Sequence, residues 1–236
     1  MLENQAVSTN QSTPVSVHKT GMIPFTLLVS LATFNIRGLG NEVKQYELNL
    51  DCKSYNLDII ALQETKVLDG YERVFKGTGN KLFIFNQTDT NINQKGGVVR
   101  VYQRGIGFLV SKRLLPCVTV IHQISDRVAY LELNIPSRSG QVTRCRVVNA
   151  YGPTSPSVRD NPVIADMFYR DLRVAMSAPK NYELFICGDL NSKIGKLSKS
   201  DIDLGVSNHV GKFAIGTRNE NGSNLLEFLI EHMTYF

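Results

Sequence analysis

Nearly unbroken apolar runs recur in this chain, and they constrain its fold more than any other feature. Residues 57–62 read LDIIAL and residues 184–187 read LFIC, without the alternation expected of a strand with one solvent-exposed face. Such runs are typical of strands that are covered on both faces. Further β-favouring runs occupy residues 27–36, 118–124, 128–135 and 142–149. Strands of this kind need a second sheet or helices against their faces.

Helical stretches separate these strands. Leu39, Val43, Tyr46 and Leu50 recur at helical spacing and predict one buried helix face. The Asn-Pro pair at 161–162 predicts the start of a second helix. Ser223 predicts the cap of a last helix, whose buried face would hold Leu225, Leu226, Leu229, Ile230 and Met233. Together these patterns predict an α/β fold, with a β-sandwich and helices packed outside it.

The predicted strands end in residues that can bind metals and phosphates. Asn35 follows ATF, Glu64 follows IIALQ, Tyr151 follows VVNA, and Asp189 and Asn191 follow LFICG. Each residue taken singly is more simply explained as a turn or cap residue. Loops gather and ligands bind at strand ends in layered folds, so their recurrence predicts a shared site.

These residue types suit metal-assisted attack on a phosphodiester. Mg²⁺ prefers carboxylate and amide oxygens, which Glu64 and Asn35 supply, and it keeps waters and a substrate phosphate in its shell. Asp189 can orient and deprotonate water. Asn191 and Tyr151 are neutral donors that can stabilise extra charge on phosphorus. We therefore expect Mg²⁺ as the cofactor, with Mn²⁺ as an alternative, and no small-molecule cofactor.

Four ordered motifs resemble those of the endonuclease/exonuclease/phosphatase superfamily: FNIRGL (34–39), LQET (62–65), NAYGPT (149–154) and GDLNSKIG (188–195). The resemblance implies a four-layer α/β/β/α fold, a two-layer β-sandwich flanked by helices. It implies Glu64 as the principal Mg²⁺ ligand, with Asn35 beside it. Tyr151 would contact the scissile phosphate, Asp189 would activate the attacking water, and Asn191 would hold a phosphoryl oxygen.

Residues 125–135 (SDRVAYLELNI) and 216–229 (GTRNENGSNLLEFL) resemble the apurinic-type endonuclease domains of non-LTR retrotransposons. Those enzymes nick DNA to prime reverse transcription of their own element. The resemblance implies a DNA endonuclease associated with a reverse transcriptase, located in the nucleus if it functions in this way. Two alternatives stay open: a phosphatase of the same superfamily, and a remnant that binds nucleic acid without catalysis.

The pattern of the family continues beyond the motifs found in this chain. Its last strands carry an aspartate on the metal side and an Asp-His pair, and the sequence contains no Ser-Asp-His. We therefore expect residues 1–24 to be a disordered lead-in and residues 25–236 to be a domain incomplete at its C-terminus, with the last strands missing. Because acid–base catalysis by such a group contributes ~10²–10⁴-fold, the chain as written is expected to be inactive.

The remaining histidines do not replace that pair. His122 alternates with Val118 and Val120 on one strand face, which favours packing. His18 lies in the expected lead-in, His209 in a loop, and His232 on the polar side of the last helix.

Charge favours an anionic partner, which the motifs suggest is DNA. The formal net charge is +5. Lys193, Lys196 and Lys199 follow the GDLN motif and Arg127 precedes a strand, so these cations are candidate phosphate contacts, although a solvated loop explains them equally well. The four cysteines form no C-x-x-C pair and indicate reduced thiols in an intracellular protein. No apolar segment reaches the ~20 residues of a membrane span, so no membrane partner is expected.

Overall fold

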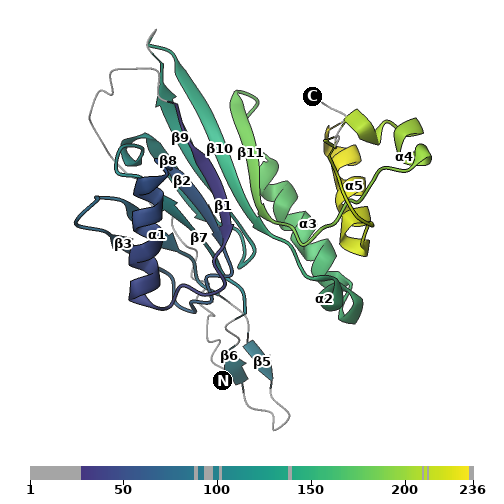
Figure 1. Cartoon of the computed structure of the whole chain (residues 1–236), viewed down its shortest axis with the longest axis horizontal. Helices are drawn as coiled ribbons and strands as arrows, with labels where there is room; N and C mark the ends of the chain where they lie inside the picture. The colour runs from purple at the N-terminus through teal and green to yellow at the C-terminus, as the bar shows by residue number, and fades with distance from the viewer. Residues whose placement is uncertain are drawn as a thin grey trace, which may run out of the picture.

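The computed structural model of this protein describes residues 28–87, 90–92, 98–100, 103–137, 140–208, 210–211 and 213–233. The expected lead-in at residues 1–24 lies outside this range. Two β-sheets lie face to face, and helices cover their outer faces (Figure 1).

The first sheet is built from the amino-terminal half of the chain. Its 5 strands have the order β1-β2-β7-β4-β3. The first two are parallel and the other pairs are antiparallel. The bounds are β1 Leu31–Asn35, β2 Ile59–Gln63, β3 Tyr71–Val74, β4 Lys81–Ile84 and β7 Ile106–Val110.

The second sheet has 4 strands in the order β11-β10-β9-β8. The β10–β11 pair is parallel, and the other two pairs are antiparallel. The outermost strands β1 and β11 lie next to each other, so the open edges of the two sheets share one side of the molecule. The bounds are β8 Val118–Gln123, β9 Val128–Pro136, β10 Val142–Tyr151 and β11 Tyr182–Asp189.

Two further strands, β5 Thr90–Ile92 and β6 Val98–Arg100, pair with each other apart from the two sheets, and they lie below the sheets in Figure 1.

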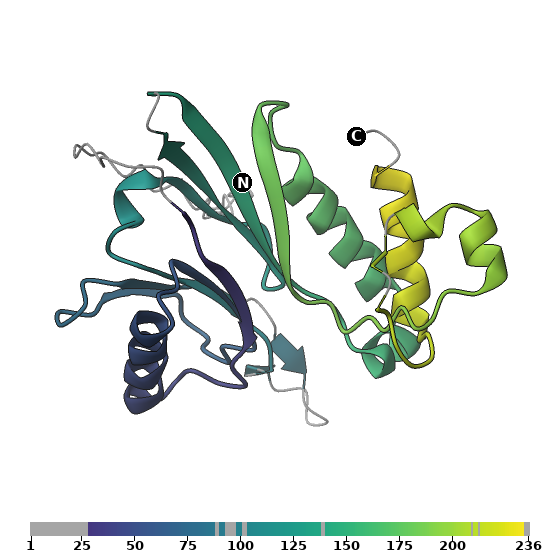
Figure 2. The same ribbon diagram turned by 45° about the horizontal axis from the view of Figure 1, so that its top comes forward.

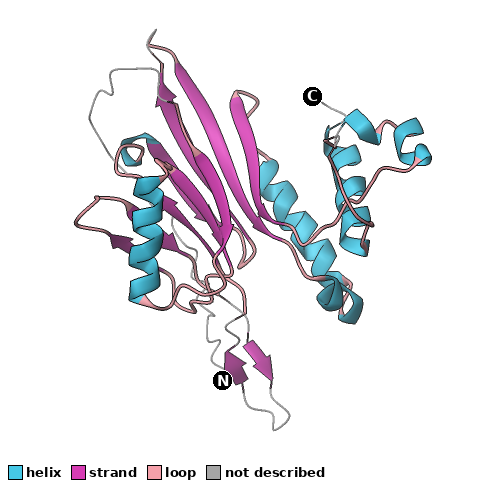
Figure 3. Cartoon of the chain, viewed as in Figure 1, coloured by secondary structure: helices cyan, strands magenta, loops and turns pink. Residues whose placement is uncertain are grey.

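Helix α1 (Glu42–Ser54) covers the first sheet, and α3 (Val163–Met176) packs on β9 and β10 of the second (Figure 2). Helix α5 (Glu220–Met233) lies beyond α3 (Figure 3). The shorter helices are α2 Ser155–Asp160, η1 Leu115–Cys117, α4 Lys199–Asp203 and η2 Val206–Asn208. This arrangement confirms the predicted four-layer α/β/β/α fold. Within the described residues, no helix combines the length and the apolar character that crossing a bilayer requires.

The main core lies between the two sheets. Phe108 and Leu131 are fully buried there, and Leu133 and Val147 are nearly so. Each such side chain stabilises the fold by about 1.5–3 kcal/mol relative to an exposed position. All four cysteines are free, as predicted.

One predicted helix face is wrong. In α1 the side chains of Val43, Tyr46 and Leu50 are exposed, and the buried face instead carries the amides Gln45 and Asn49, beside Leu48 and Cys52. The Gln45 amide donates to a backbone carbonyl and to a tyrosine hydroxyl, and the Asn49 carbonyl oxygen accepts from two side chains. Hydrogen-bonded amides can be buried at little cost, so the buried side of a helix need not be its most apolar side. For this reason the spacing of apolar residues indicated the wrong side of α1.

A buried amide pair joins the two sheets. Gln63 at the end of β2 donates from Nε2 to Asn149 Oδ1 on β10, at 2.7 Å. Asn149 Nδ2 donates in turn to Leu62 O (3.0 Å) and Gly107 O (2.9 Å) in the first sheet. Gln63 is 1% exposed and Asn149 is fully buried. The pair therefore sets how one sheet sits on the other, directly beneath the strand ends.

Replacing Asn149 with alanine should test this role. We expect Asn149→Ala to lower the free energy of unfolding by about 3 kcal/mol, because several buried polar groups would lose their partners. Urea unfolding at constant m-value measures the change. The matched control is Asn134→Ala, at an exposed position on β9, which should change stability by less than about 0.5 kcal/mol. A loss below about 1 kcal/mol in Asn149→Ala would contradict the role.

Candidate functional site

Five of the residues singled out in the sequence meet at one end of the sandwich. Asn35 ends β1, Glu64 follows β2, and Tyr151 and Asp189 end β10 and β11. Because β1 is parallel to β2 and β10 is parallel to β11, these carboxyl ends lie at the same end of the stacked sheets. Asn191 follows two residues after Asp189.

Asn35 holds together two carboxylates that come from different sheets. Its Nδ2 donates to Glu64 Oε1 at 2.9 Å and to Asp189 Oδ2 at 2.8 Å. The Tyr151 hydroxyl donates to the same Glu64 Oε1 at 3.0 Å. A neutral donor between two like charges reduces their repulsion and fixes their separation. Glu64 Oε2 takes no part in these three bonds.

The loop after β11 is folded around Asp189. The backbone N–H of Asn191 donates to Asp189 Oδ1 at 3.1 Å, and Asn191 Nδ2 donates to Gly152 O at 2.9 Å. These bonds connect the ends of β10 and β11.

Backbone strain is concentrated at this end of the sheets. The described residues include Arg37, Glu64, Lys66 and Asn191 at φ values of 50–53°, and all four lie in the loops around the site. Residues other than glycine occupy this left-handed region of backbone conformation at a cost of about 1–3 kcal/mol each. Such strain persists where surrounding contacts over-determine the conformation, which is characteristic of functional sites.

Glu64 is held in its charged form. Burial raises the pKa of its carboxyl, but hydrogen bonds from Asn35, Tyr151 and Lys66 outweigh burial and leave the pKa below its ordinary value. The Lys66 ammonium lies 3.3 Å from Glu64 Oε2. Glu64 is therefore a carboxylate at neutral pH.

Tyr151 is held in its protonated form. Burial and the negative charge of Glu64 raise the pKa of the phenol to about 12, against an opposing effect of Arg127. The phenol is consequently a hydrogen-bond donor at any physiological pH.

The Arg127 side chain contacts Tyr151 in the interior of the protein. The residue is 8% exposed, its guanidinium donates to Tyr151 O at 3.1 Å, and the guanidinium carbon lies 5.3 Å from the centroid of the tyrosine ring. The expectation that Arg127 is a surface phosphate contact therefore does not fit this structure, because its side chain faces inward.

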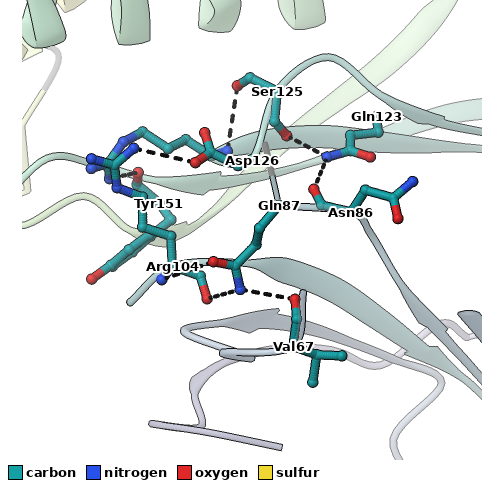
Figure 4. Close-up of polar contacts among 9 residues, drawn as sticks. Val67, Asn86, Gln87, Arg104, Gln123, Ser125, Asp126 and Tyr151 are labelled. Atoms are coloured by element: carbon teal, nitrogen blue, oxygen red, sulfur yellow. Dashed lines mark hydrogen bonds and ion pairs between the residues drawn. The ribbon is translucent and has the colours of Figure 1, made fainter. Parts of the chain in front are cut away.

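Other cations surround the site. Lys193 and Lys196 are exposed on the loop after β11, as expected from the sequence. On the opposite flank, Arg104 pairs with Asp126 at 3.2 Å, and Gln87 Nε2 anchors the backbone of Arg104 through its carbonyl at 2.8 Å (Figure 4). Lys66 N donates to Arg104 O at 2.8 Å, so this flank continues directly into the loop that carries Glu64.

The residues present fit Mg²⁺. The described part of the chain has no group of three or more His, Cys, Asp or Glu side chains arranged for a metal. Mg²⁺ does not need one, because it commonly binds through one or two carboxylates together with waters and substrate phosphates. Glu64 and Asp189 provide such carboxylates, and Asn35 Oδ1, which accepts from Arg37 N at 3.3 Å, is the amide oxygen beside them.

The two histidines within the described residues are occupied elsewhere. The His122 ring packs against Tyr130, as predicted, with centroids 5.3 Å apart. His232 stacks on Phe228 and accepts from Arg173. His18 and His209 lie outside the described residues.

Sequence reasoning missed several residues of the site. Lys66 adjoins the LQET motif and could have been included on that ground alone. Arg104 is distant from every motif, and only the pairing of residues 65–66 with residues 104–105 brings it to the site. Asn149 and Gln63 lie within two motifs, but their burial as a pair has no signal in the sequence.

The comparison with protein families identifies a family. The model of the Endonuclease/Exonuclease/phosphatase family matches residues 32–220. Craniofacial development protein 2 of Bos taurus is 26% identical over 199 residues, which are 84% of this chain and 29% of that protein. The chain thus spans less than a third of the length of this relative.

Solved structures share the fold. The APE2 catalytic domain of Xenopus laevis superposes with a TM-score of 0.53 and 16% identity, covering 84% of this chain and 67% of that one. The AP endonuclease LMAP of Leishmania major gives a TM-score of 0.51 and 14% identity, over 84% of this chain and 65% of that one. At these identities the likeness shows the fold alone.

The hydrogen bonds to Glu64 predict how its charge responds to mutation. Tyr151→Phe should raise the pKa of Glu64, since it removes a donor that favours the carboxylate. Carboxyl ¹³C NMR titration without metal measures this shift. The control is Tyr55→Phe, at an exposed position, which should leave the Glu64 pKa unchanged.

The sign of the pH effect follows from the lowered pKa. The stability that charged Glu64 contributes is complete at neutral pH, and it is lost as the pH falls below the ordinary value of 4.5 and through the folded-state pKa. A Glu64 pKa that falls, or does not move, in Tyr151→Phe would show that the Tyr151 hydroxyl does not support the carboxylate.

Proposed function

This chain belongs to the endonuclease/exonuclease/phosphatase family, and on that basis we propose that it is a magnesium-dependent phosphodiesterase domain of the DNA endonuclease type. The observation that carries the proposal is the Asn35 amide, which joins the Glu64 and Asp189 carboxylates across the two sheets. That contact supports a shared site in which we propose Glu64 as a cation ligand and Asp189 as the base, beside neutral donors for a phosphate.

Each side chain has a defined part in the proposal. Glu64 and Asn35 bind the metal, and Asp189 orients the attacking water and accepts its proton. The Tyr151 phenol and the Asn191 amide donate hydrogen bonds to the phosphate oxygens. When bound, Mg²⁺ would offset negative charge on the phosphate, and Mn²⁺ could replace it.

Cations on both flanks of the site support DNA as the substrate. Arg104 and Lys66 lie on one flank, and exposed Lys193 and Lys196 lie on the other. A nucleic acid has phosphates on both sides of the scissile bond, so it can contact cations on both flanks, whereas a small phosphate ester cannot reach both. One of the solved structures with the same fold is an AP endonuclease, LMAP of Leishmania major, which is consistent with this choice.

We further propose that the domain is of the retrotransposon type. The segments SDRVAYLELNI and GTRNENGSNLLEFL support this subtype, and with it a nuclear location and an associated reverse transcriptase. Among the described residues no histidine contacts the site. Acid–base catalysis by such a group contributes ~10²–10⁴-fold in rate, so we expect the described residues to bind DNA better than they hydrolyse it.

The proposed function predicts metal-dependent DNA binding with at most slow nicking. Fluorescence anisotropy with a labelled duplex should show tighter binding in Mg²⁺ than in EDTA. Glu64→Gln should abolish this difference, because an amide is a weaker Mg²⁺ ligand than a carboxylate. Asp189→Asn should retain much of the binding and remove any nicking of supercoiled plasmid.

Three outcomes separate the alternatives. Metal-dependent binding without any nicking would identify a remnant that binds nucleic acid. Release of phosphate from inositol lipids would favour the phosphatase. Failure to bind DNA in either buffer would overturn the proposal.

The flanking cations predict the salt dependence of binding. Arg104→Met and Lys193→Met should each lower the slope of log K against log salt by about 1, because each removes one phosphate contact. Arg170→Met on α3 is the matched control and should leave the slope unchanged. Equal slopes in all four proteins would place the DNA elsewhere on the surface.

A further inference from the structure

The segment RNENG, residues 218–222, lies against the loop that carries Asn191. Its last three residues begin α5, and its side chains bond to that loop. The sequence alone suggested only a resemblance in this region. Two of its asparagines face inward: Asn221 is 3% exposed and Asn219 is half-buried. We call this segment the asparagine clamp.

Both asparagines bind one carbonyl. Asn191 O accepts from Asn219 Nδ2 at 3.2 Å and from Asn221 Nδ2 at 3.3 Å. Asn191 is the residue held at a φ of 50°, between Asp189 and the exposed Lys193. Two donors on its carbonyl restrict rotation of the peptide that follows it, so they oppose relaxation from this strained conformation.

The same two amides reach the loop after β10. Asn219 Nδ2 donates to Ser155 Oγ at 3.1 Å, and Asn221 Nδ2 donates to Pro153 O at 2.6 Å. The clamp therefore spans both loops that bring Tyr151 and Asp189 to the site.

Asn219 also caps the amino terminus of α5. Its Oδ1 accepts from Gly222 N at 2.8 Å and from Lys193 N at 2.9 Å, so it has the capping role that the sequence assigned to Ser223. Gly222 is required by close approach, since a Cβ atom there would lie 2.0 Å from Lys193 O. The start of the helix is thus packed directly on the site loop.

Arg218 secures the outer end of the clamp. Its Nε donates to Ile194 O at 2.9 Å, and its two terminal nitrogens bind Asp201 at 3.1 and 2.6 Å. These bonds lower the pKa of the Asp201 carboxyl, which keeps the pair charged at neutral pH.

We infer that Asn219 and Asn221 are positioning residues, which hold Asn191 so that its amide and the Asp189 carboxylate face a bound phosphodiester. This role rests on the proposed function of the site. On this inference, residues 219–222 (NENG) fix the shape of the phosphate-binding loop. Neither asparagine contacts the substrate directly.

Asn219→Asp isolates the role. Aspartate caps a helix as well as asparagine does, so the acceptor bonds from Gly222 and Lys193 are kept while the donors to Asn191 and Ser155 are lost. Asn219→Ser provides a second variant, which can cap the helix but lacks the amide donors and adds no charge. The matched control is Asn41→Asp at the cap of α1, whose side chain accepts from Val43 N at 2.8 Å.

Amide hydrogen exchange and DNA affinity are the two measurements on the full chain. In both Asn219 variants we expect the Asn191 amide, which donates to Asp189 Oδ1, to exchange about tenfold faster, and the Mg²⁺-dependent affinity for a DNA duplex to fall about tenfold. Exchange in the sheets should match the wild type. Asn41→Asp should change neither quantity.

Two results would overturn the inference. One is exchange at wild-type rates in both Asn219 variants. The other is faster exchange with a DNA affinity no lower than that of Asn41→Asp. If the wild-type chain binds no DNA, the proposed function and the positioning role both fail, while faster exchange would still show that the clamp orders the loop.

Discussion

The hydrogen bonds of the buried pair Gln63 and Asn149, one between them and two from Asn149 to the first sheet, are the interaction on which the site depends. Two sheets packed through apolar side chains alone can slide over each other at small cost, because hydrophobic contact has no direction. A buried amide pair does have direction, and a displaced amide would lose its partners at a cost of about 1–3 kcal/mol each. Gln63 directly precedes Glu64, and Asn149 lies two residues before Tyr151. The bond that aligns the sheets therefore also sets the contact between the Tyr151 hydroxyl and Glu64.

Around this fixed point the fold accepts strain and concentrated charge. Left-handed backbone at Glu64 is tolerated because β2 before it is buried, and at Asn191 because its backbone N–H and side chain are hydrogen-bonded to Asp189 and Gly152. The carboxylates of Glu64 and Asp189 stay close because Asn35 donates to both. Strain and repulsion are thus balanced by local hydrogen bonds, so under the proposed function the site is arranged before a cation or a phosphate binds.

The side of the molecule beside the site is open. β1 and β11 are the outermost strands of their sheets, and Phe34, Phe185 and Ile186 are exposed on them. An unpaired strand edge is a template for another strand. Any strand added to β1 or β11 would run beside Asn35 or Asp189, so the open edges are the places from which further groups could reach the site.

The sequence by itself determined strands β1, β2 and β8 to β11, the α/β class and the five residues at the strand ends, because continuous apolar runs and the polar residues that end them are local signals. It failed where polar groups are buried. The buried face of α1 carries Gln45 and Asn49, Arg127 faces inward to Tyr151, and Asn219 caps α5 in place of Ser223. Only the tertiary structure decided these positions, because the partner that makes a polar side chain stable in the interior comes from a distant part of the chain. The separation of 86 residues between Gln63 and Asn149 shows the physical reason: their hydrogen bond exists only after both sheets have formed.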